Sequence, residues 1–184
     1  MKSFQHIGLV SSARSISADE VIELHAARLL LLLHLCGVTK RGRIDGLTKL
    51  AKLDFFVRYP QAFNRVADHL GDDVTAATNM IESNMVRHHY GPWDKRYYQI
   101  LPFLEARQLI TVTKQNHTYS FELTAIGMTA ATKLAEKPEF AAQTEQMKRV
   151  KAVLGKKTGT ALKNMIYEIF KTEVADKNLG DIIQ

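Results

Sequence analysis

The sequence predicts a mainly α-helical fold that carries one small β-hairpin. Two short segments, 109–114 and 118–123, alternate apolar with polar side chains and are joined by the polar tripeptide 115–117. This pattern is typical of a hairpin with one packed face and one wet face. Apolar side chains at helical spacing precede the hairpin at 97–104, and a second helix is expected to begin after Thr124.

The order of helix, hairpin and helix over residues 90–134 is that of the second half of a winged helix-turn-helix domain. Asp94 follows a Gly-Pro break and is placed to cap the first of these helices by accepting backbone N–H groups. Pro102 lies inside the same helix, where a proline removes a hydrogen bond and costs roughly 3 kcal/mol. We therefore expect this helix to be kinked or split near Ile100. Such a helix would fit poorly in the DNA major groove as a recognition helix.

A long helix is expected over 18–36 at the start of the domain. Ser17 and Glu20 form a capping box, and Gly37 supplies a stop. The helix is apolar nearly all round in its C-terminal half, which predicts a central position in the fold. Ile44 follows a basic turn and is the expected short strand that pairs with the hairpin.

The next helix is expected over 46–59, with Asp45 as its N-terminal cap. Its inner face carries leucine, alanine and phenylalanine side chains, and its outer face carries Lys49 and Lys52. A proline after Tyr59 ends it.

Pro60 begins a further helix at its first turn, where a missing N–H is harmless. We expect this helix to end at Gly71 with Leu70 on its buried side, together with Phe63, Val66 and Ala67. A weaker helix, rich in Thr and Asn, is expected over 72–84. Residues 85–90 are either its tail or an extended link.

Three regions are therefore expected: a leader at 1–16, a winged-helix domain with inserted helices at 17–137, and a C-terminal helical extension at 138–184. The extension carries two amphipathic helices joined by a glycine-bounded turn. The apolar face of the last helix either completes the core or packs on another chain. The partner-binding candidates are Trp93, Leu162, Met165, Ile166, Ile169 and Phe170.

Composition favours a cytoplasmic protein with a polyanionic partner. The chain has 184 residues, with 25 basic against 19 acidic side chains, for a formal net charge of +6. One cysteine, Cys36, excludes a disulfide framework and fits a reducing cytoplasm. The leucine run 29–35 falls well short of the roughly 20 apolar residues needed to cross a bilayer, and the N-terminal apolar run is too short for a secretory signal.

No catalytic, cofactor or metal site is indicated by the residue pattern. The histidines are either adjacent, as at 88–89, or dispersed over different predicted faces, which disfavours a shared metal site. The carboxylates are dispersed, and none forms a cluster for Mg²⁺. The segment GKKT at 155–158 lacks the earlier glycine and the leading strand of a phosphate-binding loop. We expect a protein that is not an enzyme and has no cofactor.

Basic side chains are the better binding candidates. The DNA-binding candidates are Lys40, Arg41, Arg43, Arg87, Lys95, Arg96 and Lys114. A further basic group in the extension comprises Lys148, Arg149, Lys151, Lys156 and Lys157. In this interpretation, Arg and Lys side chains bind phosphates, while the aromatic rings around Trp93 set the register of the protein on the DNA. The alternative for this segment is a structural corner in which Trp93 is buried, Asp94 caps and Arg96 pairs with a carboxylate.

The helix after the hairpin carries a further pattern of residues, Leu123, Thr124, Gly127, Ala131 and Leu134. It resembles the LTxxGxxxAxxL ending of winged-helix repressors of the MarR and PadR kind. Small residues at these positions allow this helix to pack closely on the domain. Winged helices bind DNA, proteins or both, so the pattern bears on the fold more than on the function.

Two stretches carry a second likeness. The first is IDGLTKLAKLDFF at 44–56, continuing to RYP at 58–60; the second is MVR at 85–87, with YGPWD at 90–94 and RY at 96–97. Together they resemble the middle component of bacterial ABC-three-component systems, which include Lamassu-type defence operons.

This resemblance implies a non-catalytic subunit that joins an SMC-like, or Rad50-like, ATPase subunit to a nuclease-type effector subunit in defence against phage or plasmids. Its main role is then to dock these two subunits, and the question whether it also contacts double-stranded DNA directly stays open. The alternative is a stand-alone winged-helix transcriptional regulator that binds DNA as a dimer, which the hairpin, the LTxxG helix and the net charge favour.

Overall fold

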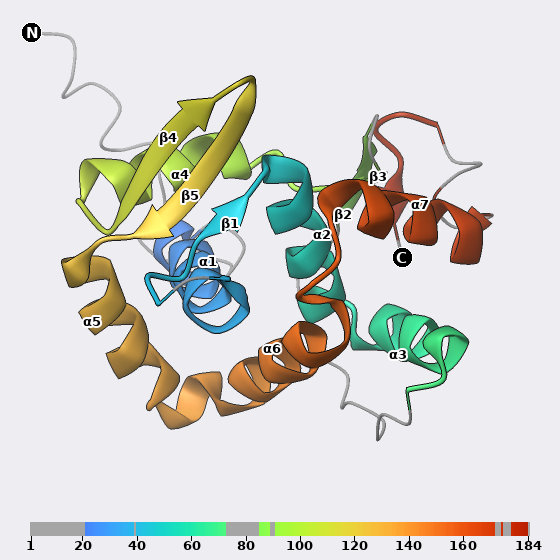
Figure 1. Cartoon of the computed structure of the whole chain (residues 1–184), viewed down its shortest axis with the longest axis horizontal. Helices are drawn as coiled ribbons and strands as arrows, with labels where there is room; N and C mark the ends of the chain where they lie inside the picture. The colour runs from blue at the N-terminus through green and yellow to red at the C-terminus, as the bar shows by residue number, and fades with distance from the viewer. Residues whose placement is uncertain are drawn as a thin grey trace, which may run out of the picture.

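A computed structural model describes residues 21–38, 40–72, 85–88, 91–171, 174 and 178–183 of the chain, without the side chains of residues 87 and 88. These residues form a mainly α-helical fold with two small antiparallel sheets, of strand order β1-β5-β4 and β3-β2-β6 (Figure 1). The predicted leader and the Ser17–Glu20 capping box lie outside the described residues. The predicted helix at 72–84 also lies outside them, apart from its first residue, Asp72.

Helix α1 (Ile22–Cys36) is the centre of the fold, as the sequence predicts. Leu29, Leu31, Leu32 and Leu33 have no exposed surface because neighbours cover the helix on every side. The neighbours are α2 (Leu47–Arg58), α4 (Tyr97–Ala106), α5 (Ala125–Ala135) and α6 (Ala141–Leu154) (Figure 1). Burying such leucines contributes roughly 1.5–3 kcal/mol each.

Helix α2 departs from the prediction at two of its three charged positions, Asp45 and Lys52. Asp45 does not cap it: this residue belongs to strand β1 (Ile44–Asp45), and Gly46 precedes the helix with no side-chain cap. Lys52 does not lie on an outer face, because strand β3 (Gly91–Trp93) covers that side of α2 and leaves Lys52 fully buried. The Lys52 ammonium donates to the carbonyl of Pro92 at 2.8 Å, which satisfies one of its protons.

Helix α3 (Pro60–Leu70) begins at its proline and ends at Gly71 in the left-handed conformation, as predicted. Phe63, Val66 and Ala67 are buried, whereas Leu70 is 37% exposed and does not continue the buried face.

Residues 85–88 are extended. Strand β2 (Met85–His88) pairs antiparallel with β3 and with β6 (Ile182–Ile183) near the end of the chain. This favours the extended link over a helix tail. The small sheet lies beside α7 (Gly159–Ile169) at one side of the molecule (Figure 1).

Helix α4 runs as one element through Pro102, so it is not split near Ile100, and the alternative of a kink stays a prediction. The proline sits on the exposed side of the helix, and the carbonyl deprived of its partner belongs to Tyr98, whose side chain is 63% exposed. Water can therefore hydrate that carbonyl, which lowers the cost of the proline. The buried face of α4 is as predicted: Tyr97, Ile100, Leu101 and Leu104.

The predicted hairpin is confirmed as β4 (Ile110–Gln115) and β5 (Thr118–Leu123). Asn116 and His117 both have positive φ and form a two-residue turn. Ile44 pairs with Phe121, as expected for the short first strand.

Helix α5 is fixed closely to the start of this hairpin. The Thr124 hydroxyl accepts from the backbone N–H of Gly127 at 3.0 Å, which confirms the predicted cap. A Cβ on Gly127 would lie 1.8 Å from the carbonyl oxygen of Leu109, so only glycine fits at this approach.

The C-terminal extension is part of the same core. After a short 3-10 turn (Pro138–Phe140), α6 packs on α1 and α2, and α7 packs on α2. Met147, Val150, Leu154, Leu162 and Ile166 have no exposed surface. Of the helices that the structure describes, none combines the length and apolar character needed to cross a membrane.

Candidate functional site: a buried charge network and a basic surface

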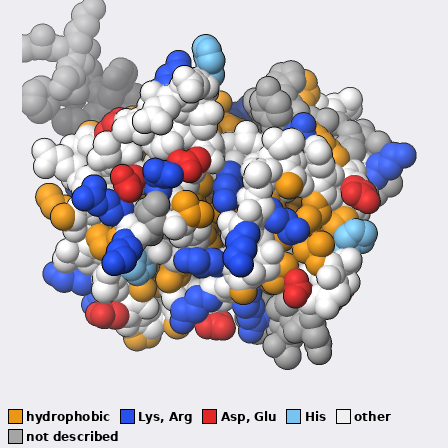
Figure 2. Space-filling view, viewed as in Figure 1, with side chains coloured by type: hydrophobic (Ala, Val, Ile, Leu, Met, Phe, Trp, Pro, Cys, Tyr) orange, Lys and Arg blue, Asp and Glu red, His pale blue; other side chains and the backbone are white. Residues whose placement is uncertain are grey.

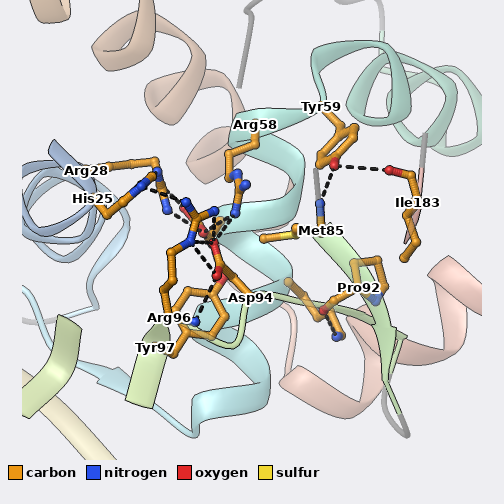
Figure 3. A network of polar contacts seen from close by, with 12 residues as sticks. His25, Arg28, Arg58, Tyr59, Met85, Pro92, Asp94, Arg96, Tyr97 and Ile183 are labelled. Atoms are coloured by element: carbon orange, nitrogen blue, oxygen red, sulfur yellow. Dashed lines mark hydrogen bonds and ion pairs between the residues drawn. The ribbon is translucent and has the colours of Figure 1, made fainter. Parts of the chain in front are cut away.

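Two aspartates and three arginines form a buried network where α1, α2 and α4 meet (Figure 3). Asp54 on α2 is fully buried and accepts from Arg28 Nε at 2.8 Å and from the Tyr97 hydroxyl at 2.7 Å. The guanidinium of Arg58, one turn later on α2, lies 3.7 Å from the same carboxylate. Asp54 thereby links three helices.

Asp94 is the second centre of the network. It accepts from Arg58 Nη1 at 2.8 Å, from Arg96 Nη2 at 2.7 Å and from the backbone N–H of Arg96 at 2.9 Å. Burial opposes ionisation of this carboxyl group, but the hydrogen bonds from Arg96 and the charge of Arg58 outweigh it and lower the pKa of Asp94 to about 2. As the predicted corner requires, Trp93 is buried and Arg96 pairs with a carboxylate, that of Asp94. Asp94 does not cap α4 as predicted: it accepts from the backbone N–H of Arg96, which is itself the N-cap residue and has no side-chain cap.

The His25 ring lies between two guanidinium groups. Its Nδ1 is 2.9 Å from Arg28 and its Nε2 is 2.7 Å from Arg96 (Figure 3). The Tyr97 phenol is fully buried; burial and the charge of Asp54 raise its pKa well above the ordinary value, so the hydroxyl stays protonated and donates.

This network holds α1, α2 and α4 in position relative to one another. Both carboxylates accept several hydrogen bonds and are at most 5% exposed, which leaves little room for a reacting group. Removing one partner from such a network leaves an uncompensated buried charge, which costs several kcal/mol. The network therefore specifies how α4 sits against α1 and α2.

A second set of contacts fixes the small sheet. The Tyr59 hydroxyl accepts from the backbone N–H of Met85 at 2.7 Å and donates to the carbonyl of Ile183 at 3.3 Å (Figure 3). One tyrosine side chain thus joins α2 to β2 and β6.

The predicted DNA-binding residues are spread over separate places. Arg96 belongs to the buried network, and its side chain is 23% exposed. Arg43 pairs with Asp45 at 3.1 Å, and the Lys114 ammonium lies 5.3 Å from the Tyr119 ring centre on the hairpin. Lys40, Arg41 and Lys95 are exposed, and the side chain of Arg87 lies outside the described residues.

The predicted partner-binding residues mostly face the interior. Trp93, Leu162, Ile166 and Phe170 are at most 4% exposed and belong to the core cluster, so they do not form a docking surface in this fold. Met165 and Ile169 are partly buried against the same cluster. This favours the core interpretation of the last helix over the partner-binding interpretation.

The outer face of the β1-β5-β4 sheet is hollowed over about 550 Å³. Its lining combines threonine and serine hydroxyls with Arg43, Asp45 and Glu122. Asp45 already pairs with Arg43 and accepts from Ser120 at 2.8 Å, so these groups satisfy one another across the strands.

The single cysteine is buried, and the described acidic and histidine side chains form no metal-binding cluster. Burial raises the pKa of the Cys36 thiol to about 12, although Lys151 and Lys49 lower it in part. No group of three or more His, Cys, Asp or Glu residues that could hold a metal occurs among the described residues.

The structure joins two basic groups that the sequence analysis kept apart. Lys151 Nζ donates to the carbonyl of Gly37 at 3.4 Å, beside the basic turn at 40–43. Lys49 Nζ donates to the carbonyl of Gly155 at 2.9 Å, beside the lysines of the extension. No local sequence signal predicts this meeting, because the pairs are more than a hundred residues apart in the chain.

Comparison of the chain with protein-family models, curated proteins and solved structures gave no match.

Proposed function

We propose that the chain is a cytoplasmic winged-helix protein that acts as a non-catalytic accessory subunit, bridging an SMC-like ATPase and an effector in defence against phage or plasmids. The winged-helix assignment is supported by the order α1, β1, α2, α4, β4, β5 and by the sheet order β1-β5-β4. In this assignment α4 is the third helix, β4–β5 is the wing, and α3 with β2–β3 is an insertion.

One observation carries the functional proposal: the two stretches that resemble the middle component, 44–60 and 85–97, lie against each other. Lys52 binds the carbonyl of Pro92, Arg58 binds Asp94, and Tyr97 binds Asp54. Polar residues of one stretch therefore have their partners in the other. The polar residues of each stretch can be buried only because the other stretch supplies their partners. Two stretches linked in this way support the resemblance more strongly than two unrelated motifs do.

The exposed end of this corner is the first candidate for a docking contact. Tyr98 is 63% exposed, and its ring centre lies 6.1 Å from that of buried Trp93. Exposed tyrosines on a rigid support are common anchors of protein interfaces. The network below the corner provides that support.

The experiment is co-expression with the ATPase and the effector that, on this proposal, are encoded beside this chain, followed by size-exclusion chromatography. We expect all three to co-elute at micromolar concentration. Tyr98→Ala should weaken co-elution, whereas Tyr119→Ala on the hairpin, 45% exposed, is the matched control. Elution of the wild-type chain alone would overturn the proposal.

The alternative, a stand-alone transcriptional regulator, is less well supported by the outer face of α4. This helix has no Lys or Arg, and its exposed side chains include Tyr98, Gln99, Pro102 and Glu105. Such a face is short of the side chains that bind bases and phosphates in the major groove. A palindromic DNA footprint that Gln99→Ala shifts would establish the regulator and displace the accessory subunit.

A further inference from the structure

Three segments that are distant in sequence form one basic surface. They are the turn after α1, the first turn of α2, and the end of α6 with the turn that follows it. The Lys151–Gly37 and Lys49–Gly155 hydrogen bonds join them, and a Cβ on Gly159 would lie 3.0 Å from the backbone nitrogen of Lys49. We name this surface the basic seam; it comprises Lys40, Arg41, Arg43, Lys49, Lys151, Lys156 and Lys157.

The seam is accessible on one face of the molecule. Lys40, Arg41, Lys151 and Lys156 are exposed, and Arg43 keeps 45% of its side-chain surface. Figure 2 shows Lys and Arg side chains gathered down the middle of the face on which Figure 1 places β1, α2 and the link from α6 to α7. The cations thus come from several elements and share one surface.

Two of these cations have ordinary structural roles. Lys151 lies in the last turn of α6, where a cation offsets the helix dipole, and Arg43 pairs with Asp45. Neither role explains why the turn at 40–43 and the turn at 155–158 bring further cations to the same place. Like charges held together repel one another, and a polyanion relieves that repulsion.

The geometry suits a phosphate backbone. The ammonium groups of Lys49 and Lys151 are each tied to one backbone carbonyl, which restrains them while leaving two of their three protons for other acceptors. Burial lowers the pKa of Lys49, and the charge of Asp45 opposes that shift. Duplex DNA presents about one negative charge per 1.7 Å of its axis, so a surface that carries several cations can meet several phosphates at once.

The three segments that carry the seam, 37–43, 47–50 and 151–158, contain no aromatic residue, which distinguishes them from surfaces that bind single strands by stacking bases. These segments also contain no Asn or Gln, the side chains that pair with adenine edges. We propose that the basic seam binds the phosphodiester backbone of double-stranded DNA without reading its sequence, and that α4 and the hairpin are not the DNA-binding elements. This deepens the DNA contact that the proposed function leaves open, and it does not require the ATPase or the effector.

The test uses the full chain and a fluorescently labelled 20-base-pair duplex of arbitrary sequence, with anisotropy measured over a salt series. The seam variant is Lys40→Gln/Lys156→Gln. The matched control is Lys95→Gln/Lys114→Gln, which removes the same charge beside α4 and on the hairpin. Thermal melts establish that both variants fold; if the double seam variant does not, the single variants Lys40→Gln and Lys156→Gln replace it.

Each lost phosphate contact lowers the slope of log affinity against log salt by about 0.9, which corresponds to about eightfold weaker binding at 0.1 M salt. We expect the seam variant to lose up to about two such contacts and the control to match the wild type. A second duplex of unrelated sequence should bind equally well.

Three results would overturn the inference. They are a wild-type chain that binds no duplex at roughly 100 μM in low salt, a control variant that loses as much as the seam variant, and tighter binding of a single strand than of the duplex. Because the isolated chain is used, failure here is separate from failure of the complex to co-elute.

Discussion

Removing the charge of Asp54 tests whether the buried network specifies the fold. Asp54→Asn preserves the shape of the side chain but removes the negative charge shared by Arg28 and Arg58, whose guanidinium groups lie 2.8 and 3.7 Å from it. Both arginine side chains are at most 3% exposed, so water cannot replace the lost charge. The amide can satisfy either Arg28 or the Tyr97 hydroxyl as an acceptor, but it removes the negative charge that lies 2.8 Å from Arg28, whereas Arg58 keeps Asp94 at 2.8 Å.

The expected loss in the free energy of unfolding is about 3–5 kcal/mol, the cost of leaving a buried charge without its partner. For a domain with a total stability of about 5–15 kcal/mol, this is a large share. With a slope of about 2 kcal/mol per M urea, the unfolding midpoint should fall by roughly 2 M.

Urea unfolding is readily followed by the fluorescence of Trp93, the single tryptophan, which is 4% exposed and lies 5.5 Å from the Tyr97 ring centre. The matched control is Asp45→Asn, because the Asp45 side chain is 44% exposed and its pair with Arg43 should contribute less than about 1 kcal/mol. If Asp54→Asn costs no more than Asp45→Asn, the network does not hold the helices as described.

Two further predictions concern the same corner and the helix after the hairpin. Because the folded pKa of Asp94 is about 2 and its ordinary value is 3.8, its ionised form stabilises the fold above pH 4, and this contribution, on the order of 2 kcal/mol, is lost as the pH falls towards 2. Urea midpoints measured from pH 5 to 2 should therefore fall less steeply for Asp94→Asn than for the wild type; parallel curves would contradict the assignment. Gly127→Ala places a methyl group 1.8 Å from the Leu109 carbonyl oxygen and should cost about 1–3 kcal/mol or more in thermal unfolding followed by circular dichroism. Thr129→Ala, at an exposed site of the same helix, should be nearly neutral, and equal melting temperatures for the two variants would refute the close approach.

The hairpin and the helix after it follow from short-range pattern. Alternation of apolar and polar side chains placed β4 and β5 within a residue of their observed ends, and Thr124 caps α5 as its position before the helix indicates. Only the turn is shorter than expected, because Asn116 and His117 both adopt positive φ and Gln115 joins the strand. Such features depend on neighbours within a few residues, so the sequence determines them by itself.

Helix periodicity predicted which segments are helical but not which charged side chains are buried. Lys52 lies on the side of α2 that spacing alone assigns to solvent, yet β3 covers that side and supplies a carbonyl. Asp54 and Asp94 looked like dispersed carboxylates, and their arginine partners come from three different elements. The strand that covers Lys52 and the arginines that pair with the two aspartates reach these positions only when distant segments pack together.

The basic seam shows the same division. Composition established an excess of positive charge, and the sequence located basic groups in the turn at 40–43 and in the extension. The packing of α6 on α1 and α2 decided that these groups share one face, through hydrogen bonds between residues 106 and 114 positions apart. Local pattern fixes helices, turns and caps because their energies are local, whereas a surface built from several segments is fixed by the core beneath it.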